Sequence, residues 1–382
     1  MNVHGRTSIH EFLGDFVVYR NLTPLDERLP GLDDVREQTR IPHDVIPRKS
    51  EPPYAHVIVE LLRAARESDA PKAKLRRLIY VGDTRMNDGN AFRNIAGAGE
   101  WPGMAFIAAE KGDATPPDII EVTKGPGPPR TLYLASRWGA ISDFEDACRD
   151  KDFAIDEHTA IVVDLDKTAL GARGRNDHVI NQARMEAVRR TVGELLGGNF
   201  DREAFETAYD VLNQSEFHPF TSDNQDYLAY ICLILGSGLY QLQPLTEEVR
   251  EARMRSFRQF IDRVDERASD LPVSLRGIHQ RIYDRVQAGD PTPFKMFRYN
   301  EYHATVERMG WKDDRASAAE LLGGEIVITQ EVREAALHWK AKGALLFGLS
   351  DKPDEASIPT EDLANEGYQP IHRVETHAVG AE

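Results

Sequence analysis

The stretch IVVDLDKTAL, residues 161–170, decides the fold because it joins a buried strand to a group of polar side chains. Its first residues are apolar and mainly β-branched, which is typical of a strand inside a sheet. The strand ends in Asp164 and Asp166, and Thr168 follows two positions later. Carboxylates at the end of a buried strand are costly unless something pairs with them. The stretch therefore predicts a strand that carries a site at its carboxyl end.

The sequence on either side of this stretch alternates strand and helix patterns. Residues 51–68 show the i, i+3, i+4, i+7 spacing of an amphipathic helix and start with two prolines. Three apolar runs predict strands: RLIYVGD (77–83), GMAFIAA (103–109) and RTLYLAS (130–136). These runs are continuously apolar, as expected for a parallel sheet covered on both faces. We expect an α/β fold with a Rossmann-like parallel sheet and helices on both faces.

The hydrophobic pattern changes in the middle of the chain, and this change divides the sequence into three segments. From about residue 176 to residue 290 helical periodicity dominates and strand patterns are missing. After residue 320 the alternation returns with GEIVITQ (324–330) and ALLFGLSDKP (344–353). We therefore expect residues 1–175 and 291–382 to form two parts of one α/β domain. Residues 176–290 are expected to form an all-helical domain between them.

Charge and composition limit the partners that this chain can bind. The formal net charge is −16, which argues against a nucleic-acid or anionic-membrane partner and allows a site for Mg²⁺. The longest apolar run, YLAYICLIL (227–235), is too short to span a bilayer. The N-terminal residues lack the apolar core of a signal peptide, and the two cysteines suit no zinc or disulfide framework. We expect a cytoplasmic protein, and the oligomeric state stays open.

Several predicted strands end in polar side chains that suit phosphoryl chemistry. Because ligands of an open α/β sheet bind at the carboxyl ends of its strands, we expect these side chains to lie together. A carboxylate can attack a phosphoryl group, and a second one can protonate the leaving oxygen. Mg²⁺ prefers oxygen ligands, and a hydroxyl and an ammonium can hold phosphate oxygens. The strand-end residues are Asp83, Asp88, Asp164, Asp166, Thr168, Thr329, Ser350, Asp351 and Lys352.

These motifs resemble those of the haloacid dehalogenase (HAD) superfamily. DLDKT (164–168) matches the DxDx[TV] signature of that family, and VITQEVREAALHWKAKG (327–343) looks like its second motif. IYVGDTRMND (79–88) looks like the fourth motif, an acidic pair after a strand. The third motif is a lysine with two candidates, Lys49 and Lys352, of which Lys49 is slightly favoured because it precedes the helix leading into the acidic strand.

The order of the motifs departs from the family pattern. In the family the DxD motif comes first and the acidic pair last, whereas here GDTRMND (82–88) precedes DLDKT (164–168). The resemblance therefore implies a circularly permuted HAD-like core, and the helical segment lies where the family inserts a cap domain. Domains whose termini lie close together tolerate such permutation.

The resemblance also implies a role for each candidate residue. Asp164 would be the nucleophile and a metal ligand, and Asp166 the general acid and base and a further ligand through its carbonyl. Thr329 would bind phosphate, and Lys49 or Lys352 would balance its charge. The remaining roles are a Mg²⁺ site completed by Asp83 and Asp88, and substrate contacts by Thr168, Arg173 and Arg175.

The expected function is a Mg²⁺-dependent phosphatase that acts on a small phosphorylated molecule through an aspartyl-phosphate. A phosphotransferase or phosphomutase of the same fold is the nearest alternative. A non-catalytic binding or regulatory protein that retained the fold is the alternative from another class. Taken singly, the acidic pairs could also be polar turns and Thr329 an ordinary strand-end residue. The sequence does not name the substrate.

Overall fold

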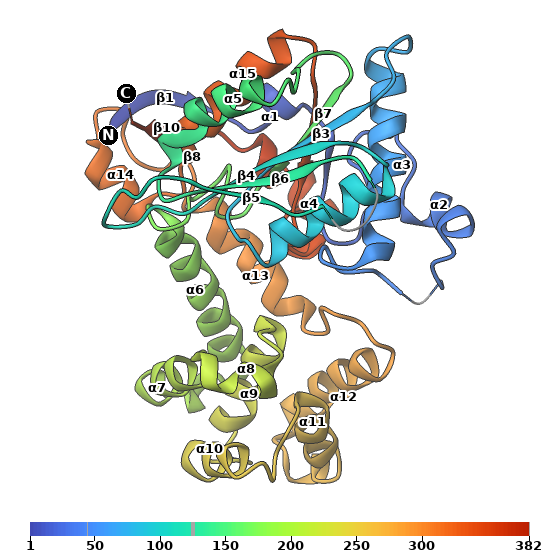
Figure 1. Cartoon of the computed structure of the whole chain (residues 1–382). Helices are drawn as coiled ribbons and strands as arrows, with labels where there is room; N and C mark the ends of the chain where they lie inside the picture. Colours follow the sequence, from blue (N-terminus) through green and yellow to red (C-terminus); the bar gives the residue numbers. More distant parts are fainter. Residues whose placement is uncertain (44, 124–126, 382) are drawn as a thin grey trace. The chain divides into compact units, whose positions relative to one another are not determined.

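The chain divides into two compact units in the computed structural model, which describes residues 1–43, 45–123 and 127–381 (Figure 1). The core unit comprises Met1–Gln182 and Thr305–Glu382, and the helical unit comprises Ala183–Ala304. The sequence pattern placed the helical segment at residues 176–290, so the two divisions differ by several residues at each boundary. In the described part of the chain, every helix is too short or too polar to cross a membrane.

A seven-stranded sheet forms the centre of the core unit. Its strand order is β2-β9-β7-β3-β4-β6-β5, and every neighbouring pair is parallel except β5 with β6. The predicted α/β class with a mostly parallel sheet is confirmed. The strands are β2 (Val17–Val18), β3 (Arg77–Gly82), β4 (Gly103–Ala108), β5 (Asp118–Glu121), β6 (Arg130–Ala135), β7 (Thr159–Asp164) and β9 (Leu345–Leu349).

Strand β7 lies between β3 and β9, so both neighbours bring their carboxyl ends to its end. Val162 is aligned with Tyr80 of β3 and with Phe347 of β9. Two residues further along β7, Asp164 is aligned with Leu349, the last residue of β9. The segments that follow β3, β7 and β9 therefore start at the same edge of the sheet.

Helices cover both faces of this sheet, as the continuously apolar strands predicted (Figure 1). On one face, α3 (Pro52–Asp69) and α4 (Asn87–Ala98) pack on side chains such as Tyr80 and Val162 in a fully buried cluster. On the other face, Phe144 of α5 (Ile141–Asp150) packs against Phe106 and against Trp339 of α15 (Gln330–Ala341), with ring centroids 5.7 and 6.3 Å apart. Shorter helices of the unit are α1 (His10–Leu13), α2 (Leu32–Thr39), α14 (Ala318–Gly324) and α16 (Glu361–Asn365).

A second, three-stranded sheet corrects one expectation from the sequence. Its order is β1 (Asn2–Thr7), β10 (Thr376–Gly380) and β8 (Ile328–Thr329), with β8 parallel to β10. The run GEIVITQ therefore forms a strand, but that strand does not join the seven-stranded sheet that holds Asp164. Periodicity predicts a strand from its own residues and carries no information about its partner. The strand formed by residues 376–380 near the C-terminal end is fully buried.

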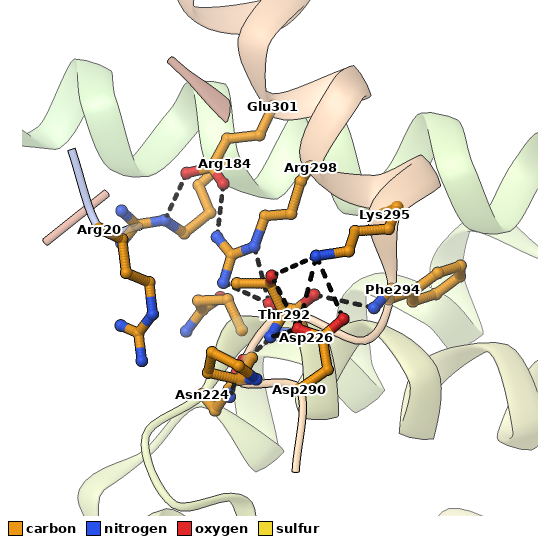
Figure 2. Close-up of polar contacts among 12 residues, drawn as sticks. Arg20, Arg184, Asn224, Asp226, Asp290, Thr292, Phe294, Lys295, Arg298 and Glu301 are labelled. Atoms are coloured by element: carbon orange, nitrogen blue, oxygen red, sulfur yellow. Dashed lines mark hydrogen bonds and ion pairs between the residues drawn. The ribbon is translucent and has the colours of Figure 1, made fainter. Parts of the chain in front are cut away.

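The helical unit contains no strand, and all of its residues are described. A buried network of charges joins three of its helices (Figure 2). Arg298 donates from Nε to Asp226 Oδ2 at 2.7 Å and from Nη1 to Glu301 Oε2 at 2.6 Å. Arg184 donates from Nε to the other oxygen of Glu301 at 3.1 Å. The helices are α6 (Asp177–Leu196), α7 (Arg202–Leu212), α8 (His218–Thr221), α9 (Gln225–Gly236), α10 (Leu242–Arg250), α11 (Phe257–Asp265), α12 (Val273–Gln287) and α13 (Lys295–Val306).

Candidate functional site

Three buried carboxylates meet at the carboxyl edge of the seven-stranded sheet. Asp164 is the last residue of β7, Asp83 follows the last residue of the neighbouring strand β3, and Asp88 lies in the first turn of α4. One carboxylate oxygen from each of the three lies within 4.8 Å of the others, and all three side chains are buried. We call this group the acidic cluster. The sequence predicted that these three residues would come together, and the structure brings them together.

Lys49 supplies a positive charge to the acidic cluster. Its Nζ donates to Asp88 Oδ1 at 2.7 Å and to the carboxylate of Asp164, and it lies 5.6 Å from the centre of the Tyr80 ring. Lys352, the other candidate, is also buried and donates to Thr305 Oγ1 at 3.2 Å. Of the two candidates, Lys49 is thus the lysine that contacts the acidic cluster directly, through Asp88 and Asp164.

Asp88 accepts so many hydrogen bonds that it suits an anchoring role better than a metal-binding role. Its Oδ2 accepts from the backbone N–H groups of Asp83 and Thr84 at 3.0 and 2.8 Å and from the Thr84 hydroxyl at 3.0 Å. Its Oδ1 accepts from Lys49 and from the Tyr80 hydroxyl at 3.1 Å. A carboxylate has about four lone-pair positions, and these donors use them. Asp88 therefore fixes Lys49 and the turn after β3.

A glycine makes this close approach possible. A Cβ atom added to Gly82 would lie 2.6 Å from the Cβ atom of Asp88, which is closer than real side-chain contacts. Only glycine allows the carboxylate of Asp88 to reach back to the backbone N–H groups at the end of β3. The GD…D spacing of the sequence is thus explained by the geometry of one turn.

Asp83 and Asp164 are the two carboxylates that remain suited to a metal ion. The Oδ2 of Asp164 accepts from the Thr168 hydroxyl at 2.8 Å, and the Oδ2 of Asp83 accepts from Nε of Arg173. Each therefore keeps lone pairs that could face a cation. Arg173 lies in the loop after β7, and its carbonyl accepts from the indole of Trp138 at 3.2 Å, which fixes this backbone.

The charges of the cluster are out of balance without a further cation. Burial, with the nearby carboxylates of Asp164 and Asp88, raises the pKa of Asp83 to about 9. Burial also raises the pKa of Asp164 to about 7, although Lys49 opposes this. Burial disfavours ionised Asp88 as well, but Lys49 and the hydrogen bonds to the carboxylate outweigh it and lower its pKa. The two carboxylates with raised pKa values are those left to bind a cation, which would favour their ionised forms.

The donor set fits a hard divalent cation. Asp83 and Asp164 offer oxygen atoms only, and no cysteine or histidine belongs to the acidic cluster. Mg²⁺ prefers such oxygens and keeps part of its coordination shell for water and substrate phosphate. Asp83 and Asp164 would hold the ion.

Asp166 lies in a tight turn directly after the strand. The residue next to it, Lys167, has a positive φ of 65°, and Asp166 forms an isolated bridge with Leu170. Its side chain is partly exposed, in contrast to buried Asp164. A partly exposed carboxylate can exchange protons with solvent, as an acid and base must.

Thr329 and Ser350 are the two candidates for the hydroxyl that binds phosphate, a role that the sequence analysis assigned to Thr329. The Thr329 hydroxyl donates to the carbonyl oxygen of Thr168 at 2.5 Å, and its backbone N–H donates to the carbonyl oxygen of Ala169 at 2.9 Å. It therefore supports the loop from outside the seven-stranded sheet. Ser350 follows β9 directly and is thus one residue beyond the partner of Asp164. Its oxygen accepts from the N–H of Lys352 at 3.1 Å, which leaves its own hydrogen to be donated.

Arg175 is held in structural ion pairs. Its guanidinium donates to both carboxylate oxygens of Glu331 at 2.9 Å and to Glu110 at 3.0 Å, and its side chain is 5% exposed. These bonds tie the loop after β7 to α15. Of the two arginines named from the sequence, Arg173 contacts the acidic cluster and Arg175 contacts other acids.

Sequence reasoning missed several residues of the site. Tyr80 and Thr84 were not singled out, although Tyr80 alternates in β3 with residues of the other face and Thr84 follows the GD pair. Tyr54, in the first turn of α3, is buried and its hydroxyl has no hydrogen-bond partner among the described residues. Burial raises the pKa of Tyr54 above its ordinary value, with Lys49 opposing, so its hydroxyl stays protonated. Aromatic residues in apolar runs look like ordinary core, so only the fold reveals these positions.

Comparison with family models, with curated proteins and with solved structures finds no match for this chain.

Proposed function

We propose that this protein is a Mg²⁺-dependent phosphohydrolase of the HAD type, which forms an aspartyl-phosphate on Asp164. The observation that carries the proposal is the contact of Asp164 with both Lys49 and Thr168, next to the carboxylate of Asp83. A carboxylate held by an ammonium and a hydroxyl, at the edge of a rigid sheet, is positioned as a nucleophile. The substrate would be a small phosphorylated molecule.

The proposed reaction has two displacements at phosphorus. In the first, one carboxylate oxygen of Asp164 attacks the phosphoryl group, the bond to the leaving oxygen breaks, and Asp166 donates a proton to that oxygen. In the second, Asp166 takes a proton from water, whose oxygen attacks phosphorus and releases Asp164 as a carboxylate. Bound Mg²⁺ would supply positive charge to the phosphoryl oxygens. Lys49 and Ser350 would hold the equatorial phosphoryl oxygens.

The proposal revises two assignments made from the sequence. Ser350 replaces Thr329 as the phosphate-binding hydroxyl, because Ser350 follows the strand next to β7. Thr329 becomes a positioning residue for the loop that holds Thr168. Lys49 replaces the pair of lysine candidates, because its ammonium contacts Asp164.

The strand order also supports the proposed circular permutation. The acidic pair follows β3, which precedes β7 in the chain but lies beside it in the sheet. At the other side of β7 the order is β9 and then β2, although β2 is near the N-terminus and β9 is near the C-terminus. A break between β9 and β2 in an ancestral order would give the present order. The helical unit would then be the cap, inserted between β7 and β9.

Activity assays with phosphomonoesters test this proposal. The wild-type protein is expected to release phosphate from at least one member of a broad panel with Mg²⁺, and to stop when EDTA removes the metal. Asp164→Asn keeps the shape of the side chain but removes the nucleophile, so it should abolish the release. Asp118→Asn, at an exposed position of β5, is the matched control and should leave activity unchanged.

The phosphatase assay, together with binding measurements, also distinguishes a hydrolase from a phosphotransferase and from a non-catalytic binding protein. Phosphate transfer to an added alcohol in place of water would identify a phosphotransferase. A protein that binds neither Mg²⁺ nor beryllofluoride, and that hydrolyses no member of the panel, would be a binding protein instead. Phosphate release that survives in Asp164→Asn would contradict the nucleophile assignment.

A further inference from the structure

A basic cavity lies between α3 and α4, away from the acidic cluster. It has a volume of about 380 Å³, and its lining includes His56, Arg93 and Arg130 but no carboxylate among the described residues. A second cavity of about 280 Å³ shares His56 with it and adds Arg40 and Arg63, with Glu60 as its one acid among the described residues. In the second cavity Arg63 pairs with Glu60 at 2.8 Å, so the larger cavity, with two arginines and no acid in its described lining, is the better candidate for an anion.

The two arginines of the larger cavity have no charged partner among the described residues. Arg93 donates to the side chain of Asn90, and Arg130 donates from Nη2 to the carbonyl of Ala96 at 3.4 Å. The Nε atom of Arg130 is buried and has no hydrogen-bond partner in the described part of the chain. Partly buried guanidinium groups normally pair with an anion, because an unpaired charge or N–H group is costly away from water. An anionic ligand would satisfy both groups.

The rest of the lining favours a phosphate group attached to an organic molecule. Guanidinium groups match phosphate oxygens through paired hydrogen bonds. Gly97 leaves room beside them, since a Cβ atom there would lie 3.9 Å from Nη1 of Arg130. Pro52, Ala98 and Val122 add apolar surface to the same cavity. The described lining has no hydroxyl, thiol or carboxylate side chain, so binding without turnover is expected.

We propose that this cavity is a binding site for a small phosphorylated molecule, separate from the acidic cluster. The two helices that form it also begin at the acidic cluster. Asp88 is in the first turn of α4, and Asn94 of the same helix donates to the carbonyl of Ser50, the residue after Lys49, at 2.9 Å. A ligand held by α3 and α4 would therefore stabilise the segments that position Lys49 and Asp88. The proposal does not depend on the proposed function, because binding can be measured without activity.

Isothermal titration of the full chain with inorganic phosphate and with phenyl phosphate tests the site. The titrations use Asp164→Asn protein with EDTA, so that no probe is consumed. Replacing both arginines (Arg93→Gln with Arg130→Gln) should weaken binding to this cavity about tenfold or more. The matched control is Arg202→Gln, an exposed arginine of the helical unit paired with Glu206, which should leave binding unchanged.

A second variant keeps both arginines and fills the space between them. Gly97→Leu should also weaken binding, and tryptophan fluorescence and circular dichroism should show that each variant is folded. Tighter binding of phenyl phosphate than of phosphate would identify an organic phosphate as the ligand, and equal binding would identify free phosphate. The same binding isotherm in the control, the double arginine variant and Gly97→Leu would overturn the proposal.

Discussion

Among single residues, Lys49 is the one whose ammonium contacts two carboxylates of the acidic cluster. It lies between Asp88 and Asp164, and these carboxylates raise its pKa well above its ordinary value although burial opposes this. An ammonium in this position stays charged at every physiological pH. It therefore holds two carboxylates close together before any metal or substrate binds, which is the preorganisation that electrostatic catalysis needs.

The first prediction compares two buried lysines. Lys49→Met should lower phosphatase activity by about 10²-fold or more, because it removes the charge that holds Asp164 and the phosphoryl oxygens. Lys352→Met is the matched control, since its ammonium contacts Thr305 and is equally buried. Steady-state assays at saturating Mg²⁺ measure both. Losses of equal size in the two variants would show that the role of Lys49 is wrongly assigned.

A second prediction at this scale concerns His372, which is buried in the core unit. Its Nε2 lies 3.1 Å from Asp15 Oδ1 and its Nδ1 lies 3.4 Å from the Tyr19 hydroxyl. Burial lowers the pKa of His372 from 6.5 to about 4, although Asp15 opposes this. Because the unfolded chain binds the proton more readily, stability should be complete above pH 6.5. It should fall by up to about 3 kcal/mol as the pH decreases to 4.

Urea denaturation at a series of pH values checks this dependence. His372→Gln should remove the part of the slope between pH 6.5 and 4, and His4→Gln, at an exposed position of β1, should retain it. A slope that is identical in wild type and His372→Gln would mean that this histidine does not titrate differently in the folded and unfolded chains.

At the scale of elements, the carboxyl ends of β3, β7 and β9 define the site. Each strand delivers a different group: the anchoring carboxylate of Asp88 and the carboxylate of Asp83 after β3, the proposed nucleophile Asp164 at the end of β7, and the hydroxyl of Ser350 after β9. Strand β8 contributes from a different sheet, through the hydrogen bond of Thr329 to Thr168. The two hydroxyl residues should therefore respond differently to substitution.

The third prediction separates these two hydroxyls. Ser350→Ala should lower the rate of phosphate release by about 10²-fold, as expected for the loss of one donor to the phosphoryl group. Thr329→Val should cost about 1 kcal/mol of stability through its lost hydrogen bond, with a smaller effect on rate. Thermal unfolding and steady-state assays on both variants give the comparison. A larger loss of rate in Thr329→Val would restore the assignment made from the sequence.

The sequence was sufficient to predict three central strands and the acidic residues at their ends. It was not sufficient to predict the sheet that β8 joins or the side-chain contacts in the site. Apolar runs identified β3, β7 and β9, and the acidic residues at their ends were recognised, because both signals are local. The sheet that β8 joins depends on β1 and β10, whose residues lie at the two ends of the chain. The choice between Lys49 and Lys352 depends on where each side chain points. The number of hydrogen bonds that Asp88 accepts depends on the backbone conformation of the turn after β3. The partner strand of β8, the direction of each lysine side chain and this turn cannot be read from the order of residues.

At the scale of the whole molecule, the chain consists of two compact units, and each contains buried charges. The core unit is stabilised by apolar packing on two faces of a sheet. The helical unit buries charges, with Asp226 and Glu301 both 1% exposed or less and both bound to Arg298. A buried charge left without its partner is strongly destabilising. The helical unit should therefore be sensitive to a substitution that does not affect the core unit.

The fourth prediction uses the positions of the tryptophans. All four tryptophans, Trp101, Trp138, Trp311 and Trp339, lie in the core unit. Arg298→Met removes the arginine bound to buried Asp226 and one of the two arginines bound to Glu301, so it should destabilise the helical unit by about 3–5 kcal/mol. The change should appear as earlier loss of helical circular dichroism in urea, while the tryptophan fluorescence transition stays near its wild-type position. Arg202→Met, at an exposed ion pair of the same unit, is the control.

The central claim is that Asp164 forms a covalent aspartyl-phosphate, and chemical trapping tests it most directly. The protein is mixed with Mg²⁺ and a phosphomonoester that it hydrolyses, quenched in acid and reduced with borohydride, which converts an acyl phosphate of aspartate to homoserine. Peptide mass spectrometry should then find homoserine at position 164 and aspartate at positions 83, 88 and 166. Unmodified Asp164 in protein quenched during turnover, or homoserine at another aspartate, would contradict the account.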